Sequence, residues 1–203
     1  ILAAKNRGYN GEITIGGVSL NKVNENNLMQ RVVLVRHNSY LFKGTVEENL
    51  KMAKPDATKE EMEAVLQKVN LLGFLQTQDG LQTQLLEKAS NLSGGQCQRL
   101  VIARALLRTD SAVYIFDEAA SNIDVESEEL IMNVIHELAK TKTVLLISHR
   151  LANVVKSDKI YFLKDGEIKE SGKHDELMSQ NGAYRHLYES QMALENYGKG
   201  GVA

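Results

Sequence analysis

The chain has 203 residues, of which 43% are hydrophobic and 25% are charged. These fractions are ordinary for a folded globular protein and exclude wholesale disorder, and the length is sufficient for a full hydrophobic core. The formal net charge of −2 argues against a dedicated nucleic-acid or anionic-membrane binder. The single cysteine, Cys97, cannot form an internal disulfide and favours a reducing compartment. Because the sequence opens on Ile1 without a recognisable first element, we expect a fragment of a longer protein.

The first sixty residues predict a hairpin, a buried strand and two helix starts. Gly16-Gly17 separates segments 12–15 and 18–20, and two glycines supply the positive φ that a tight hairpin turn needs. Residues 31–35 form a β-branched run, as expected of a buried strand. The S/T-x-x-E pattern of a capping box, which marks a helix start, occurs twice, at Thr45 with Glu48 and at Thr58 with Glu61.

Residues 45–108 are expected to be mostly helical. The second capping box leads into an apolar stripe at helical spacing, which we expect to stop at Gly73 and which consists of Met62, Val65, Leu66, Val69 and Leu72. A further helix is predicted to run from Ser93 to about Arg108.

The second half of the chain predicts alternating strands and helices. Segments 112–116 and 143–147 are continuous apolar runs, as expected of strands that are covered on both faces in a parallel sheet. Between them, residues 125–140 predict a helix with an apolar face of Ile131, Val134, Ile135 and Leu138. A second hairpin is expected over 159–170, and a last helix carries an apolar stripe of Tyr184, Leu187, Tyr188 and Met192. The order strand–helix–strand predicts an α/β fold.

The segment Asn91-Leu92-Ser93-Gly94-Gly95-Gln96-Cys97-Gln98-Arg99 is the strongest candidate for chemistry. Ser93 is suited to cap the helix that follows, and the glycines let several backbone amides point outward together. Unpaired amides and the positive end of the helix dipole form an anion site, which points to phosphate. The alternative is a loop before an ordinary amphipathic helix.

Two carboxylates, Asp117 and Glu118, follow the apolar run 112–116. Ligands of open α/β sheets bind at the carboxyl ends of strands, so the pair suits a magnesium–nucleotide site, in which one acid holds the cation and the other activates water. The alternative is a pair of acids that marks where a strand exits to solvent. Asp124 has two interpretations as well, a functional one and that of an N-cap for the next helix.

His149 follows the second apolar run, 143–147. A histidine at a strand end is able to hydrogen-bond a terminal phosphate or to hold a catalytic water, although an isolated one is more often a loop residue. The order of the features favours the functional interpretation, because an anion-binding helix start, an acid pair and a histidine follow one another along the chain.

These segments resemble the ATP-binding-cassette (ABC) ATPases. Leu92-Ser93-Gly94-Gly95-Gln96 resembles their signature peptide, residues 113–118 resemble the Walker B strand, residues 121–124 the D-loop, and His149 the switch histidine. Three further segments are similar to the exporter branch, namely 44–49, 147–151 and 165–177. The similarity extends from about Gly11 to Met192.

The resemblance implies an α/β P-loop NTPase (RecA-like) fold, with a mostly parallel sheet, an inserted α-helical signature subdomain and an incomplete N-terminus. It divides the chain into the remainder of the ATPase core (1–44), the signature subdomain (45–108), a second core part with Walker B, D-loop, switch histidine and hairpin (109–172), and C-terminal helices with a tail (173–203).

The function implied is that of an ATP-hydrolysing domain that works at the cytoplasmic face of a membrane. In this family two such domains dimerise head to tail and move an attached transmembrane domain, and no nucleic acid is involved. By resemblance, Ser93, Gly94, Gly95 and Gln96 contact the partner's ATP. Asp117 holds Mg²⁺, Glu118 is the general base, His149 contacts the γ-phosphate and Asp124 communicates across the dimer.

Two departures from the family pattern bear on this expectation. The chain has no G-x-x-x-x-G-K-[ST] phosphate loop, which the family places just before the helix that residues 1–5 are expected to finish. We therefore expect this chain alone to bind ATP weakly and to hydrolyse none. In addition, His37 stands where the family usually has a glutamine that reaches the metal and the attacking water, so coupling is either altered and pH-sensitive or the change is tolerated.

Two other functions compete with the exporter ATPase. A non-catalytic subunit that only donates its signature motif would have little use for Glu118 and His149. Soluble relatives in DNA repair or translation usually carry coiled-coil insertions or linked tandem cassettes, and neither feature occurs in this sequence.

Overall fold

The computed structural model describes the backbone of residues 8–200 and the side chains of residues 8–195. The expected end of a helix at residues 1–5 lies outside this range. The chain forms two compact units, and the boundary between them falls between Ile147 and Ser148.

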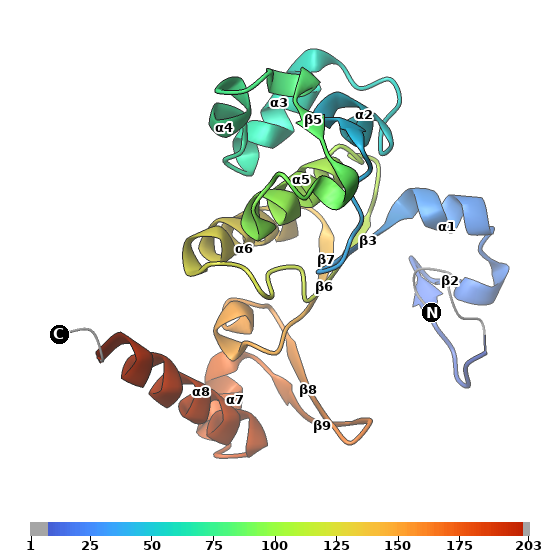
Figure 1. Cartoon of the computed structure of the whole chain (residues 1–203). Helices are drawn as coiled ribbons and strands as arrows, with labels where there is room; N and C mark the ends of the chain where they lie inside the picture. The colour runs from blue at the N-terminus through green and yellow to red at the C-terminus, as the bar shows by residue number, and fades with distance from the viewer. Residues whose placement is uncertain (1–7, 201–203) are drawn as a thin grey trace. The chain divides into compact units, whose positions relative to one another are not determined.

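A parallel sheet lies at the centre of the first unit (Figure 1). Its strands are β3 (Val32–Arg36), β6 (Val113–Asp117) and β7 (Thr143–Ile147), in the order β3-β6-β7. The register places Arg36 beside Asp117 and Asp117 beside Ile147 at the carboxyl end of the sheet. The predicted α/β fold with a parallel sheet is confirmed.

The two faces of this sheet belong to different clusters of apolar side chains. One face joins the main core together with helices α5 (Gly94–Leu106) and α6 (Val125–Ala139). It does so through Val33, Val35, Tyr114, Phe116, Val144 and Leu146. The opposite face joins a smaller cluster around Leu20, Leu28, Val32 and Ile115. That smaller cluster contains no residue of β7, and Leu145 and Ile147 are 41% and 43% exposed. The prediction that β7 is covered on both faces is therefore wrong for the described residues, because the N-terminal elements pack only on β3 and β6.

The N-terminal hairpin is confirmed. Strands β1 (Thr14–Ile15) and β2 (Val18–Ser19) pair antiparallel, and Gly16 and Gly17 between them have φ angles of 58° and 78°. A 3₁₀ turn at Leu20–Lys22 leads to α1 (Glu25–Arg31), which the sequence analysis did not predict. This helix has seven residues and buries only Leu28, so it produces no apolar stripe.

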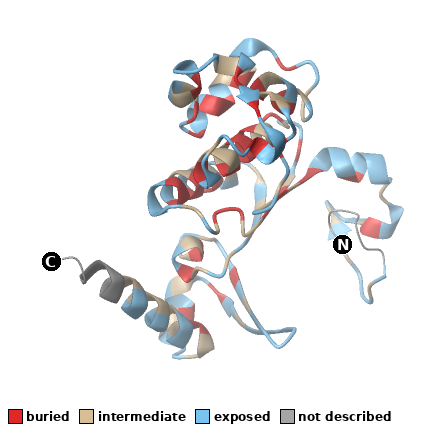
Figure 2. Cartoon of the chain, in the orientation of Figure 1, coloured by how far each residue is buried: buried red, intermediate tan, exposed pale blue. Residues whose placement is uncertain are grey.

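Residues 45–108 are mostly helical, as predicted. Both capping boxes form, with the hydroxyl of Thr45 accepting from the Glu48 amide and that of Thr58 from the Glu61 amide. The elements are β4 (Gly44–Thr45), α2 (Val46–Lys51), α3 (Lys59–Lys68), α4 (Leu72–Gln76), η2 (Gly80–Gln82), β5 (Gln84–Leu85), η3 (Glu87–Ala89) and α5 (Gly94–Leu106). Buried residues gather along α5, which runs through the main core (Figure 2).

The expected helix stop at Gly73 is wrong. Helix α3 ends at Lys68, and Gly73 lies inside the short helix α4. The chain turns at Asn70, whose φ is 52°, while the Leu71 amide donates to the Leu66 carbonyl at 2.9 Å. Asn tolerates the left-handed conformation that ends a helix, and it takes here the place expected for glycine.

Helix α6 (Val125–Ala139) connects β6 to β7, as predicted, and its expected apolar face packs into the main core. A strand–helix–strand crossover of this kind is what allows two strands to pair in parallel. It also brings the carboxyl ends of both strands to the same edge of the sheet.

The described part of the second unit contains a hairpin of strands β8 (Ile160–Lys164) and β9 (Glu167–Gly172). Its helical segments are η4 (Leu151–Val154), α7 (His174–Ser179) and α8 (Ala183–Gly200). The hairpin turn at Asp165 and Gly166 is confirmed, with φ angles of 54° and 77°. Of the stripe expected on the last helix, Tyr184 is fully buried but Leu187 is 41% exposed. Within residues 8–200, no helix has the length and apolar character that a membrane crossing requires.

Candidate functional site

The carboxyl edge of the sheet carries an ion pair that the sequence analysis missed. Arg36 ends β3, Asp117 ends β6, and Nε of Arg36 lies 3.5 Å from Oδ2 of Asp117. Both side chains are partly exposed, so the pair contributes little to stability. The signal for Arg36 was its position at the end of a predicted strand, but only the strand order reveals that its neighbour is Asp117.

Glu118 has a strained backbone directly after β6. Its φ is +53°, its amide donates to the Ile147 carbonyl at 3.0 Å, and its carbonyl accepts from both the amide and the hydroxyl of Ser121. A left-handed conformation outside glycine costs of order 1–3 kcal/mol and persists where the surroundings fix it, most often at functional sites. Three hydrogen bonds fix this peptide, so the position of Glu118 is set by β7 and by the turn that follows.

The acid pair fits a magnesium ion by its chemistry, since carboxylate oxygens are the protein ligands that Mg²⁺ prefers. Among the described residues no group of three or more His, Cys, Asp or Glu side chains could hold a metal. A magnesium ion at Asp117 would therefore take its remaining ligands from water and phosphate, as is usual for this ion.

The start of α5 has the predicted cap. The Ser93 hydroxyl accepts from the Gln96 amide at 3.2 Å, and the Gln96 side chain accepts from the Ser93 amide at 2.9 Å. The amides of Gly94 and Gly95 are the first two of the helix and have no partner within it. With the dipole of a 13-residue helix behind them, these amides are suited to bind an anion.

Three of the predicted site residues, Gly94, Gly95 and Asp124, lie where the start of α5 meets the start of α6. A Cβ atom on Gly95 would lie 2.3 Å from Oγ of Ser127 and 3.1 Å from Oδ2 of Asp124. Gly94 has more space, because the nearest atoms to such a Cβ are 3.9 Å away. The signature and the D-loop thus form one packed corner, and it is Gly95 that permits the close approach.

Asp124 is the N-cap of α6, as one of its two interpretations held. Its Oδ1 accepts from the Ser127 amide at 2.8 Å. Hydrogen bonds from the Ser127 amide and hydroxyl hold the pKa of Asp124 below its usual value, and the charge of Arg99 lowers it further. Asp124 therefore stays ionised at neutral pH.

We expect Gly95→Ala and Gly94→Ala to behave differently in the purified protein. The methyl group at position 95 would overlap Ser127, so this variant should unfold at a temperature several degrees lower. Gly94→Ala should unfold within about 2 °C of the wild type, because its methyl group would meet its nearest neighbours only at ordinary van der Waals distance. Thermal unfolding measures both. Equal midpoints for the two variants would contradict the tight packing of this corner.

His37 lies next to the acid pair through its backbone. Its amide donates to the Asp117 carbonyl at 3.2 Å, and its side chain is exposed. The turn is held at Arg36, whose amide donates to the Ser39 hydroxyl at 2.9 Å and whose carbonyl accepts from the Ser39 amide at 3.2 Å. Because these bonds use no atom of the imidazole, the backbone of the turn does not depend on which side chain occupies position 37.

Asn49 is a structural residue of this region that the sequence analysis did not single out. It is fully buried in α2, and its side chain bonds the amide and the carbonyl of Phe42, both at 2.8 Å, and the carbonyl of Thr45 at 3.0 Å. It thereby holds the segment that follows the His37 turn. There Tyr40 and Phe42 form an exposed edge-to-face pair with ring centroids 4.8 Å apart. A polar residue among the buried positions of a short helix was the available signal.

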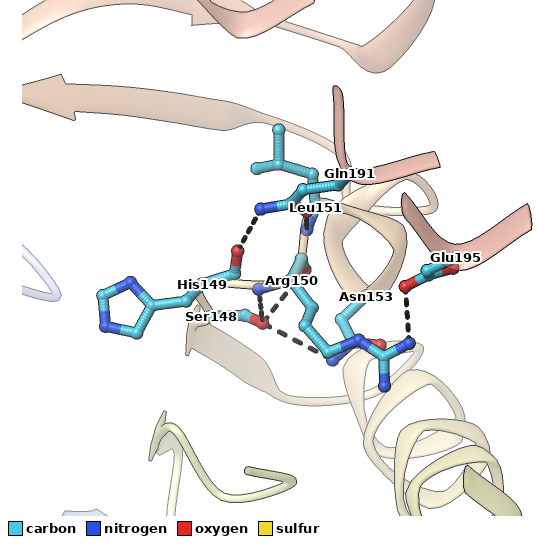
Figure 3. Close-up of polar contacts among 7 residues, drawn as sticks. All are labelled: Ser148, His149, Arg150, Leu151, Asn153, Gln191 and Glu195. Atoms are coloured by element: carbon cyan, nitrogen blue, oxygen red, sulfur yellow. Dashed lines mark hydrogen bonds and ion pairs between the residues drawn. The ribbon is translucent and has the colours of Figure 1, made fainter. Parts of the chain in front are cut away.

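His149 belongs to the second unit (Figure 3). It is exposed, and its ring points away from the polar contacts that its neighbours make with α8. The Ser148 hydroxyl bonds the amide and the carbonyl of Arg150, which closes a tight turn around His149. This turn sets the backbone from which the imidazole projects.

Comparison with known proteins agrees with the motifs. Residues 1–121 match the model of the family described as ABC transporter. The chain belongs to this family. The ABC-type ATP-binding domain expected from the signature and Walker B segments is thereby confirmed, together with its P-loop NTPase fold.

Similar ABC proteins include exporters. An uncharacterised ABC transporter ATP-binding protein of Haemophilus influenzae is 48% identical over 195 residues, which are 96% of this chain and 35% of that protein. An ATP-dependent lipid A-core flippase of Vibrio vulnificus is 41% identical over 183 residues, 89% of this chain and 31% of the flippase. The structure of a bacterial Atm1-family ABC exporter with ATP bound matches with a TM-score of 0.86 at 29% identity, covering 94% of this chain and 33% of that one. The chain thus spans about a third of the length of these proteins.

Proposed function

We propose that the chain is the ATP-hydrolysing domain of an ABC exporter, which drives transport by closing head to tail on a second such domain. The observation that carries the proposal is the arrangement in the first unit. There the ion-paired Asp117 and the conformationally fixed Glu118 end one strand, and the free amides of α5 lie at the corner with the D-loop. The acid pair and the anion site are the two kinds of group that phosphoryl transfer needs, one to hold the metal and activate water and one to bind phosphate.

The roles proposed for the residues follow from their chemistry. Asp117 holds a magnesium ion, which when bound neutralises charge on the phosphate oxygens. Glu118 accepts the proton of the attacking water, and a fixed backbone suits a general base because it limits the positions of the carboxylate. His149 donates a hydrogen bond to the terminal phosphate.

The second half of the proposed site faces a partner domain. Ser93 and Gly94 are exposed at the start of α5, where a phosphate held by another domain is able to approach the first amides of the helix. We therefore assign Ser93, Gly94, Gly95 and Gln96 to the ATP of the partner, and Asp124, packed on Gly95, to communication across the dimer. Either a homodimer or a heterodimer satisfies this arrangement.

A transmembrane domain is the other proposed partner, which would place this domain at the cytoplasmic face of a membrane. The exposed Tyr40–Phe42 pair supports this assignment, because Asn49 holds the backbone amide and carbonyl of Phe42, so that the two rings form an apolar surface on a fixed segment. The pair follows the His37 turn directly in the sequence, so a movement of that turn would displace the surface that contacts the transmembrane domain.

The test compares ATP hydrolysis by two preparations. We expect the whole transporter, reconstituted in lipid with its transmembrane domain, to release phosphate, and the 203-residue chain alone to bind ATP weakly and to release none, because it lacks the phosphate-loop lysine and amides. Single-turnover assays with radiolabelled ATP measure both. Turnover by the chain alone would contradict its inactivity. An inactive transporter would favour the alternative, a non-catalytic subunit that donates its signature to another protein's ATP.

We expect His37→Gln to leave the ATPase rate and its pH profile unchanged within about twofold, because the turn is held by backbone bonds that the imidazole does not share. The measurement is kcat of the reconstituted transporter between pH 6 and pH 8, with Asn38→Gln in the same turn as the control. A profile that loses a step near neutral pH in His37→Gln alone would show instead that the histidine takes part in coupling.

A further inference from the structure

The side chain of Gln191 on α8 hydrogen-bonds the backbone at both ends of the turn that carries His149. The Nε2 of Gln191 donates to the His149 carbonyl at 2.8 Å, and its Oε1 accepts from the Leu151 amide at 2.9 Å (Figure 3). A carboxamide has both a donor and an acceptor, so one glutamine engages two backbone groups two residues apart. All of these atoms lie within the second unit.

A second contact from the same helix supports the first. Glu195 lies one turn after Gln191 on the same face of α8, and its Oε1 is 2.6 Å from the guanidinium of Arg150. The helix thus contacts three consecutive residues, His149, Arg150 and Leu151. Leu151 is buried, which anchors the far end of the turn.

These contacts act on the backbone of His149 and use no atom of its ring. The imidazole points away from Gln191 and from the Arg150–Glu195 pair (Figure 3). A side chain that must reach a phosphate from an exposed turn is effective only when its backbone is held, since a displacement of about 1 Å at a catalytic group costs on the order of a hundredfold in rate.

We propose that Gln191 is a positioning residue for His149, which holds the turn so that the imidazole is presented in one orientation. The proposal rests on the function proposed above for His149. It assigns a role in ATP hydrolysis to the C-terminal helix.

The experiment uses the reconstituted whole transporter and two variants of one residue. Gln191→Ala removes both hydrogen bonds, whereas Gln191→Glu has the same length and keeps an acceptor for the Leu151 amide but loses the donor to the His149 carbonyl. The matched control is Glu189→Ala on the same helix, an exposed residue that pairs with Arg185. Each is measured for kcat and KM, for hydrogen exchange of residues 148–155 without nucleotide, and in combination with His149→Ala.

We expect Gln191→Ala to lower kcat about tenfold with little change in KM. In the same variant, hydrogen exchange at residues 148–155 should rise about fivefold to tenfold, the equivalent of one net hydrogen bond. The kcat of Gln191→Glu should lie between those of Gln191→Ala and the wild type. Combined with His149→Ala, the loss of Gln191 should add almost nothing, because the group that it positions is gone. Glu189→Ala should match the wild type in every measurement.

Unchanged exchange in Gln191→Ala, or losses that simply add to those of His149→Ala, would overturn the positioning role. A failure of the proposed function gives a different result. In that case the wild-type protein would release no phosphate, or the His149→Ala variant would keep full activity. The exchange measurement needs no nucleotide and therefore decides whether Gln191 holds the turn in either case.

Discussion

Glu118→Gln in the reconstituted transporter is expected to lower kcat for ATP hydrolysis by about a hundredfold to ten-thousandfold, the usual contribution of a general base. The amide has the shape of the carboxylate but accepts no proton from water. The backbone at this position is fixed by the Ile147 carbonyl and by Ser121, so the exchange should not disturb the fold. Phosphate release at saturating ATP gives the rate, and ATP binding to the variant should persist.

The matched control for this experiment is Glu129→Gln, which makes the same chemical change at an exposed position of α6. It should retain the wild-type rate. A Glu118→Gln protein with more than about a tenth of the wild-type rate would remove Glu118 from the role of base, because the water would then lose its proton by another route. The signature-donor alternative would gain support from the same result.

Asn49→Ala is expected to destabilise the first unit by about 2–4 kcal/mol, since it removes the partners of the Phe42 amide and carbonyl and of the Thr45 carbonyl and leaves a small void at a fully buried position. For a unit of this size, the corresponding transition should move down by about 5–10 °C in calorimetry. Hydrogen exchange at residues 40–50 should increase at the same time, because this segment loses its anchor.

Asn26→Ala on α1 is the control for that variant, since Asn26 is exposed and its side chain makes no bond of this kind in the described residues. It should leave the transition within about 1 °C of the wild type. If Asn49→Ala were equally mild, the hydrogen bonds to Phe42 would not hold this segment, and the rigid Tyr40–Phe42 surface proposed for the membrane domain would lose its basis.

Features set by groups close together in the sequence were predicted correctly. The capping boxes at Thr45 and Thr58 and the cap at Ser93 join groups three residues apart. Both hairpin turns depend on residues that tolerate positive φ. One local error, the helix stop assigned to Gly73, came from a competing residue, because Asn70 also adopts the left-handed conformation. Another was the missed short helix α1, which buries only Leu28.

Features that depend on the meeting of distant segments were not predictable. The partner of Arg36 is 81 positions away and became visible only when β3 paired with β6 in its actual register. The close approach of Gly95 to Ser127 requires the crossing of α5 and α6, and the open face of β7 depends on how far the N-terminal elements extend across the sheet.

The sequence by itself determined the family, the order of the motifs and the chemical types of the candidate site residues, because those are written in adjacent positions. The tertiary structure decided which of these residues touch, that Glu118 is held in a strained conformation by β7, and that Gln191 reaches the turn of His149 across 42 positions. Such contacts follow from strand register and helix packing, which many residues fix together and no short segment encodes.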